Sequence, residues 1–348
     1  MTRRPLGDVF AASCTTDGGI FGYRLFSDGA LTETARIPVD RPMYFIKRGD
    51  VFHTLLRAPD GLGGMSGYAA CRFGQAVPAP VSTGGRVACH LTVTNRRIYA
   101  VNYLSGSVSM IGGMTVTHTR EMLRGIPHPT KAVPFAEPWQ RERLALQAGR
   151  QDASHPHQII PAPDGRFLLT ADLGLDAVFV YDLELNLCGI ARTPRGSGAR
   201  HMVFGVKQKD GSYPLFCVCE LDAAVCTFSY RDGQLTFLCA ASSHIARPDN
   251  TAAAIRLSPD GKTLFASHRG EDCISAFDVG ESGQLTWLYN AACGGRDPRD
   301  FCLTPAGDFL ISANEGDGCL TVLPVAGNRV LPPVTRVALP SALCVWAE

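Results

Sequence analysis

Three stretches of the sequence decide the fold: PDGRFLLTADLGLDAVFVYDL (residues 163–183), PDGKTLFASHRGEDCISAFDV (259–279) and PAGDFLISANEGDGCLTVLPV (305–325). Each begins with a Pro-x-Gly turn, continues as an apolar strand, passes through a short polar turn and ends in a second apolar strand. Two apolar runs joined by a short glycine-containing turn predict an antiparallel β-hairpin. The chain therefore repeats one hairpin unit.

Four further stretches follow the same pattern less closely, at 8–26, 49–73, 94–113 and 210–230. The first strand of successive units ends at Cys14, Leu56, Asn102, Asp172, Glu220, His268 and Asn314. The intervals between these positions are 42, 46, 70, 48, 48 and 46 residues, so one interval holds an insertion. Repeats of forty-odd residues with short strands are typical of β-propellers. We predict an all-β, seven-bladed β-propeller with four antiparallel strands per blade.

The seven units account for the whole length, so we expect one propeller domain over residues 1–348 with an inserted loop at about 114–153. Within this insertion, residues 137–151 show helical periodicity and could form one short helix. The terminal LCVWAE reads as a strand that pairs with the N-terminal DVFAASC and closes the ring. Such pairing would remove an exposed sheet edge.

Composition and charge exclude several classes of protein. Hydrophobic residues make up 45% and charged residues 19%, which is typical of a soluble globular chain. The 33 basic residues nearly cancel the 32 acidic ones, so a general nucleic-acid or acidic-membrane binder is not expected. No apolar run approaches a membrane span or the apolar core of a signal peptide. The thirteen scattered cysteines lack paired metal spacing and indicate reduced thiols in a cytoplasmic protein.

The repeat also predicts where the polar residues gather. In a propeller blade the first strand lines the central channel and the second runs antiparallel to it, so the start of the first lies beside the end of the second. This places most of the histidines and many of the charges around one mouth of the channel, where a small ligand would meet convergent polar groups. The candidates that begin first strands or end second strands are His90, Asn102, His155, His157, Arg200, His201, Glu220, Arg269, Arg299 and Asp300.

Two of these positions allow alternative interpretations. Glu220 follows the apolar run PLFCVC, so we expect it at the edge of a buried region. Its carboxylate there either forms an ion pair with a nearby arginine or acts as a base with a raised pKa. The His-Pro-His run at 155–157 could chelate a metal, but it has no third ligand nearby, so we expect no metal. No nucleotide-binding loop or nucleophile elbow is present, and we expect no cofactor.

Several motifs resemble one known family. The stretches that carry the resemblance are SHPHQIIPAPDGRFLLTADLGLDAVFVY (154–181), GSGARHMVFG (196–205), CELDAAVCTFSY (219–230) and DPRDFCLTPAGDFLISANEGDGCLTVL (297–323). In this order they resemble the lactonase family of seven-bladed propellers, which includes propeller-type 6-phosphogluconolactonases and carboxy-cis,cis-muconate cyclases. The resemblance covers nearly the whole chain and is strongest from about residue 84 onward. Cys219 stands where the family often has Asn, and His268 where it often has Asn or Asp.

The resemblance implies hydrolysis of a sugar lactone without a metal, with 6-phosphogluconolactone as the expected substrate. Carried over by position, the family's proposed active site falls on His155 or His157, Arg200, Glu220 and Arg269. We expect Glu220 or His157 to be the base and Arg200 to stabilise the oxyanion or clamp a carboxylate. Arg269 and Arg299 would hold the anionic end of the substrate, since a guanidinium matches phosphate and carboxylate. His90, Asn102, His201, Arg299 and Asp300 are the expected substrate-binding residues.

Two alternatives remain open. A cycloisomerase could use the same residues on a carboxylated muconolactone, and its product would have the mass of its substrate. A non-catalytic propeller could bind a ligand or a protein on the same face. The sequence indicates no oligomeric state.

Overall fold

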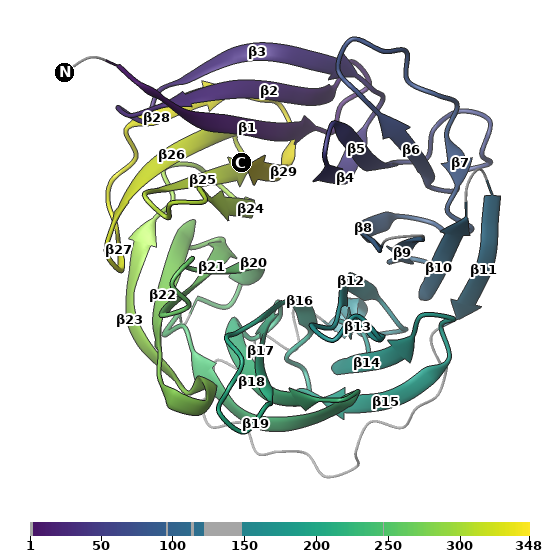
Figure 1. Cartoon of the computed structure of the whole chain (residues 1–348), viewed down its shortest axis with the longest axis vertical. Coiled ribbons are helices and arrows are strands. Elements are labelled where there is room, and N and C mark those ends of the chain that lie inside the picture. The colour runs from purple at the N-terminus through teal and green to yellow at the C-terminus, as the bar shows by residue number, and fades with distance from the viewer. Residues whose placement is uncertain (1–2, 95–96, 113–114, 122–147, 246) are drawn as a thin grey trace.

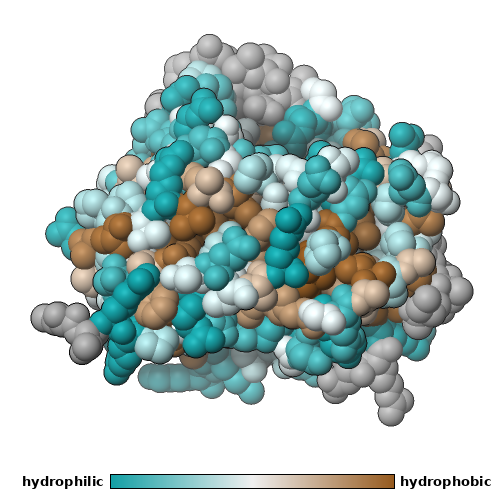
Figure 2. Space-filling view, turned by 90° about the horizontal axis from the view of Figure 1, so that it is seen from above, coloured by the Kyte–Doolittle hydropathy of each residue, from teal (hydrophilic) through white to brown (hydrophobic). Residues whose placement is uncertain are grey.

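The structure is a computed structural model of the chain, and it describes residues 3–94, 97–112, 115–121, 148–245 and 247–348. Seven antiparallel sheets surround a central channel (Figure 1). This arrangement confirms the predicted seven-bladed β-propeller. Seen edge-on, the molecule carries hydrophilic residues on both sides of a brown, more hydrophobic band (Figure 2).

The strands of each blade are given from the channel outward. Blade 1 comprises β29 (Ala342–Ala347), β1 (Pro5–Ser13), β2 (Gly19–Phe26) and β3 (Leu31–Pro38). Blade 2 comprises β4 (Pro42–Arg48), β5 (Val51–Leu56), β6 (Gly67–Cys71) and β7 (Val81–Ser82). Blade 3 comprises β8 (Ala88–Val93), β9 (Ile98–Asn102), β10 (Ser107–Gly112) and β11 (Thr115–Glu121).

The later blades follow the same order. Blade 4 comprises β12 (Pro156–Pro161), β13 (Phe167–Asp172), β14 (Ala177–Asp182) and β15 (Leu187–Arg192). Blade 5 comprises β16 (Ala199–Phe204), β17 (Tyr213–Cys219), β18 (Ala224–Arg231) and β19 (Gln234–Ser242). Blade 6 comprises β20 (Thr251–Leu257), β21 (Thr263–Arg269), β22 (Cys273–Val279) and β23 (Leu285–Ala292). Blade 7 comprises β24 (Pro298–Leu303), β25 (Phe309–Asn314), β26 (Cys319–Ala326), the short β27 (Arg329–Val330) and β28 (Thr335–Ala338).

The ring closes within blade 1, as the sequence predicted. Strand β29, from the C-terminus, pairs antiparallel with β1, so that Val345 lies opposite Ala11. Val345 is 2% exposed and packs in a cluster with residues of blades 1 and 7. Closure therefore pairs β1 on both of its sides, so that β1 is not an edge strand.

The expected insertion at 114–153 is shorter in the structure. Its first part, TVTHTRE, forms β11 and pairs with β10, so it is the fourth strand of blade 3. This segment contains a single aliphatic residue, so hydrophobicity did not mark it as a strand. Most of the helix expected at 137–151 lies outside the described residues; Ala148–Arg150 form one 3-10 turn, η1. A second, η2, spans Glu281–Gly283.

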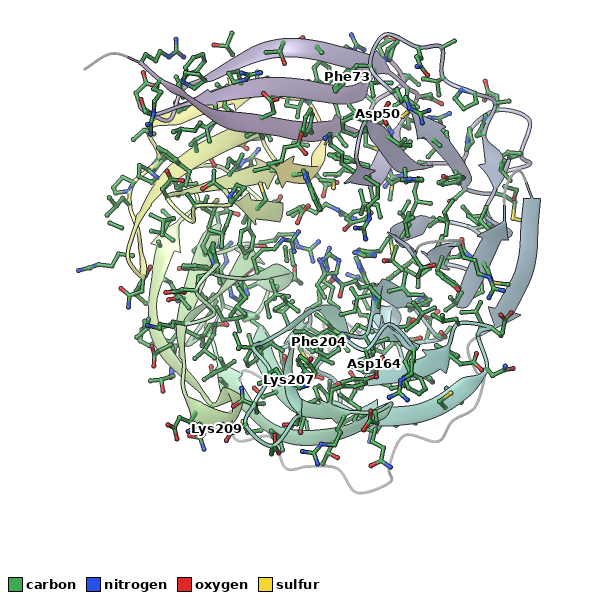
Figure 3. All side chains as sticks on the ribbon, viewed as in Figure 1. Asp50, Phe73, Asp164, Phe204, Lys207 and Lys209 are labelled. Atoms are coloured by element: carbon green, nitrogen blue, oxygen red, sulfur yellow. The ribbon has the colours of Figure 1, made fainter. Side chains whose placement is uncertain are left out.

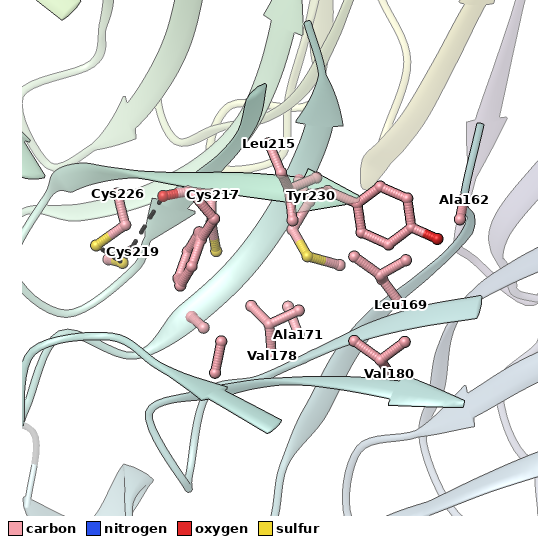
Figure 4. Close-up of a cluster of buried hydrophobic side chains, with 14 residues drawn as sticks. Ala162, Leu169, Ala171, Val178, Val180, Leu215, Cys217, Cys219, Cys226 and Tyr230 are labelled. Atoms are coloured by element: carbon pink, nitrogen blue, oxygen red, sulfur yellow. Dashed lines mark hydrogen bonds between the residues drawn. The ribbon is translucent and has the colours of Figure 1, made fainter. Parts of the chain in front are cut away.

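The blades are held together by apolar clusters between neighbouring sheets. Between blades 4 and 5, Leu169, Val178 and Val180 pack against Leu215 and Tyr230, and all five are at most 1% exposed (Figure 4). Burial of this kind contributes about 25 cal/mol per Å² of apolar surface. All thirteen cysteines are free, and most are buried in such clusters. Among the described residues, no helix is long and apolar enough to cross a membrane.

The closure generates a stability prediction. Replacing Val345 by Ala should lower the free energy of unfolding by about 2 kcal/mol, because a buried side chain is truncated at the seam of the ring. Val206 is 60% exposed, and Val206→Ala should change it by less than about 0.5 kcal/mol. Urea titration of both variants measures the difference. Equal midpoints would show that β29 does not contribute to the stability of the ring.

Candidate active site

The hairpin register brings two sets of residues to one mouth of the channel. Pro156 at the start of β12 lies opposite Asp172, Ala199 lies opposite Cys219, and Thr251 lies opposite Arg269. We call this end the strand-start mouth and the opposite end the strand-end mouth. Side-chain nitrogens gather around the channel that joins them (Figure 3).

Each innermost strand also carries a register shift near its strand-start end. At the shift, the innermost strand has one more residue than its neighbour. In six blades this residue is Leu343, Met43, Cys89, His157, Arg200 or Arg299, and in blade 6 the shift spans Ala253 and Ala254. A bulge bends its strand and re-aims a side chain, and bulges are common next to active sites. We call these positions the bulge ring.

The bulge ring surrounds a small cavity of about 10 Å³. Its lining is Met43, Tyr44, Cys89, His157, Arg200, His201, Arg299, Asp300 and Leu343. A space of this size is about enough for one water molecule. The cavity brings together five of the ten predicted residues, with the polar members of the ring contributed by blades 4, 5 and 7.

Glu220 connects this cavity to further predicted residues. It follows β17, is 1% exposed, and its Oε2 accepts a hydrogen bond from Arg200 Nε at 2.7 Å. Its Oε1 accepts from Arg150 Nη2 at 2.8 Å and lies 3.0 Å from Arg269 Nη2. One carboxylate therefore meets three guanidiniums, which leaves an excess of two positive charges within this network.

The three guanidiniums differ in how freely they can reach a ligand. The Arg200 side chain is 2% exposed and also donates through Nη1 to the carbonyl of Ala253. The Arg269 side chain is 17% exposed, and its buried Nε has no partner among the described residues. The Arg150 side chain is 38% exposed and donates through Nε to the Tyr103 hydroxyl at 3.0 Å.

Burial and charge set the protonation states. Burial raises the pKa of Glu220, but Arg269, Arg200 and Arg150 outweigh it and hold that pKa well below its usual range. Burial lowers the pKa of the His157 imidazole well below 6.5, and Arg200 lowers it further. Glu220 is therefore ionised and His157 neutral at pH 7. Of the two interpretations of Glu220, the geometry supports the first, in which its carboxylate forms ion pairs with arginines and is not a base with a raised pKa.

His157 has the features of a proton acceptor. Its Nδ1 is buried without a hydrogen-bond partner in the described part of the chain. Its ring packs edge-to-face with that of His201 at 5.2 Å between centroids, and His201 likewise has two buried nitrogens without partners there. Burial also keeps His201 neutral by lowering its pKa. A neutral imidazole with a free nitrogen can take a proton from water.

Two predicted residues are occupied by structural contacts. The Asn102 amide donates to the hydroxyls of Ser107 and Ser109, and its oxygen accepts from Thr83, all within the buried part of blade 3 and its neighbour. His155 bonds the backbone oxygen of Tyr103 at 3.0 Å through Nδ1 and Asp152 at 2.9 Å through Nε2. Of the two histidines of the His-Pro-His run, the structure therefore places His157 at the bulge ring.

His90 and Asp300 lie one step deeper along the channel. Both line a larger cavity at the strand-end mouth, and Asp300 also borders the small cavity. His90 directly follows Cys89, and Asp300 directly follows Arg299. The register shift at these two bulge-ring residues cannot be recognised from the alternation of hydrophobic and polar residues in the sequence. Arg299 lies at the bulge ring as expected and donates to Glu315 at 2.9 Å.

The ten candidates do not include Arg150 or Tyr103, although Tyr103 follows Asn102 at the end of a second strand and so belongs to the predicted mouth. Arg150 belongs to the insertion, which has no repeat to place it, and only its nearness to the His-Pro-His run could have signalled it. Tyr103 follows β9 and stacks on the His155 ring at 4.5 Å. Within the described ranges, no group of three or more His, Cys, Asp or Glu side chains could hold a metal ion.

Comparisons with known proteins agree with this architecture. An uncharacterized protein of Lactococcus lactis subsp. cremoris is 32% identical over 84% of this chain and 83% of its own. The solved periplasmic gluconolactonase of Pseudomonas aeruginosa is 24% identical, covers 98% of both chains and has a TM-score of 0.82. A candidate 6-phosphogluconolactonase of Bacteroides fragilis is 22% identical with the same TM-score and coverage. The family described as lactonase, 7-bladed beta-propeller matches residues 8–346, so the chain belongs to the lactonase family.

Proposed function

We propose that this protein hydrolyses a sugar lactone and that its substrate is anionic, with 6-phosphogluconolactone as the specific candidate. The observation that carries the proposal is the buried Glu220, which fixes three guanidiniums beside the neutral His157. Membership of the lactonase family supports the reaction class. The excess of two positive charges supports an anionic substrate, since guanidinium groups bind phosphate and carboxylate.

Lactone hydrolysis needs a water, a base and a stabilised oxyanion. In the proposed reaction, His157 Nδ1 takes a proton from a water at the small cavity while the water oxygen attacks the lactone carbonyl. Arg200 and Arg269 face the negative charge that develops on the carbonyl oxygen. The ring carbon–oxygen bond then breaks, the ring oxygen takes the proton from His157, and the product is a hydroxy acid.

The cavity of about 10 Å³ is too small for a sugar, so the lactone would bind on its strand-start side. Arg150 is the most exposed of the three arginines and would meet the phosphate there. Glu220 acts in this scheme as the anchor of the arginines, because guanidinium groups occupy both of its oxygens, whereas His157 Nδ1 has no partner among the described residues.

We infer a cytoplasmic location from the thirteen free cysteines, of which Cys188 and Cys239 are exposed. Exposed free thiols persist in a reducing compartment.

One prediction of the proposed function concerns Arg269. With freshly generated 6-phosphogluconolactone, Arg269→Ala should lower kcat/KM by about 100- to 1,000-fold, because one donor to the oxyanion is lost. The matched control is Arg192→Ala, since Arg192 is also half-buried and donates to a backbone carbonyl, that of Leu175. It should retain activity within about twofold.

Two results would contradict this assignment. Wild-type hydrolysis no faster than the spontaneous reaction would exclude this substrate, and carboxylated muconolactones would then be tested for an isomer of unchanged mass. Equal losses in the two arginine variants would show a general effect on folding.

Another prediction of the proposed function concerns the pH dependence of kcat. Because the pKa of His157 lies well below 6.5, the base is already unprotonated at pH 6, and wild-type kcat should be flat between about pH 6 and 7.5. It should fall only in more acidic solution, where His157 takes up a proton. His157→Gln should lower kcat by about 100- to 10,000-fold. A wild-type kcat that rises through a midpoint near pH 6.5 would contradict this assignment.

A further inference from the structure

The strand-end mouth holds a second cavity, of about 580 Å³. Pockets for small molecules commonly measure about 300–1,000 Å³. Its walls come from the later parts of innermost strands, including Lys47 of β4, Arg256 of β20 and Trp346 of β29. The cavity contains none of the Glu220 network, because the bulge ring and the residues that follow it lie between the two mouths.

The polar end of this cavity carries fixed hydrogen-bond donors. The Gln158 side-chain oxygen accepts a hydrogen bond from the backbone N–H of Met202, so the NH2 group of Gln158 is the part that can donate a hydrogen bond to a ligand. His90 Nδ1 accepts from the backbone N–H of Ile159 at 3.5 Å, which places the proton of the neutral ring on Nε2. The His90 ring stacks on Tyr44 at 4.2 Å between centroids, so both side chains are held in place.

The charge of the lining is positive. Arg256 donates to Asp300 at 2.6 Å, but its side chain is 28% exposed whereas that of Asp300 is 4% exposed. Asp300 also accepts from the backbone N–H of Val345, so it is turned toward the protein. Lys47 and Arg48 add two more cations to the lining, and Lys47 is paired with Glu348, which directly follows the lining residue Ala347, at 2.7 Å. Asp300 is the only acid of the lining among the described residues, so the lining stays positive with Glu348 included.

The remaining walls are mostly apolar. They include Leu91, Ile160, Leu257 and Leu303, and the exposed Trp346 stands among them. Apolar walls combined with a few fixed donors and a cationic lining suit a molecule that has an apolar body and one acidic group.

We propose that the strand-end mouth is a second binding site, which takes a small organic anion with an aromatic or other apolar body. The acidic group is held by Arg256, Lys47 and the Gln158 amide, and the apolar body lies against the aliphatic walls and Trp346. The site is separate from the proposed lactone site and does not depend on that proposal.

The test uses the whole protein and the fluorescent anion 8-anilinonaphthalene-1-sulfonate. It should bind one molecule per chain, and Trp346→Ala and Lys47→Gln should each raise Kd by about five- to tenfold. Its uncharged analogue, N-phenyl-1-naphthylamine, should bind at least about tenfold more weakly, since it lacks the anionic group.

Matched controls separate this cavity from the general surface. Phe237 is 39% exposed, against 38% for Trp346, and lies on the outer strand β19. Arg336 pairs with Asp317 at 2.8 Å, as Lys47 pairs with Glu348 at 2.7 Å, and lies on β28. Phe237→Ala and Arg336→Gln should leave Kd within about twofold.

Three results would overturn the proposal. Unchanged Kd in Trp346→Ala and Lys47→Gln, or equal losses in the control variants, would place the probe elsewhere. Displacement of the probe by 6-phosphogluconate would show that the two mouths do not hold separate sites.

One further measurement separates this proposal from the proposed function. Unchanged probe binding in Arg269→Ala would support separate sites whether or not the protein hydrolyses lactones.

Discussion

The architecture of the channel depends on one backbone constraint, the shift in register that each innermost strand makes near its start. A regular strand points successive side chains to opposite faces, so that a residue beside the channel axis is followed by one packed between blades. The extra residue in each blade breaks this alternation and directs His157, Arg200 and Arg299 at one small cavity. Blade 6 contributes Ala253, whose carbonyl accepts from Arg200. Seven weakly similar repeats thereby build a single asymmetric site.

The charges of Glu220 and its three arginines determine the electrostatics at the strand-start mouth. Removing a carboxylate from water is costly unless cations and hydrogen bonds compensate, and Glu220 meets that condition through three arginines. The same contacts order the guanidiniums before any substrate arrives, which is the kind of preorganised positive charge that stabilises an oxyanion. Burial keeps His157 neutral in this positive surrounding, so the proposed proton acceptor and the cations proposed to stabilise the oxyanion coexist at neutral pH.

The fold could be predicted from the sequence because each hairpin carries its own turn and apolar signals, and because the count of units sets the number of blades. The same register placed Glu220 and Arg269 at one mouth. Side-chain partners could not be predicted: Asn102 is taken up by hydroxyls of its own blade and its neighbour. The deeper position of His90 could not be predicted either, because the one-residue register shift before it leaves no trace in the alternation of hydrophobic and polar residues. Arg150 comes from a segment without a repeat, so only the three-dimensional contact reveals it.

The most direct test of this account is a crystal structure of the protein with bound 6-phosphogluconate, the product of the proposed reaction. We expect its carboxylate at the strand-start mouth, within hydrogen-bonding distance of Arg269 or Arg200 and beside His157, with its phosphate near Arg150. Density for the sugar acid in the cavity at the strand-end mouth, or on the outer surface of the blades, would contradict the assignment of the active site.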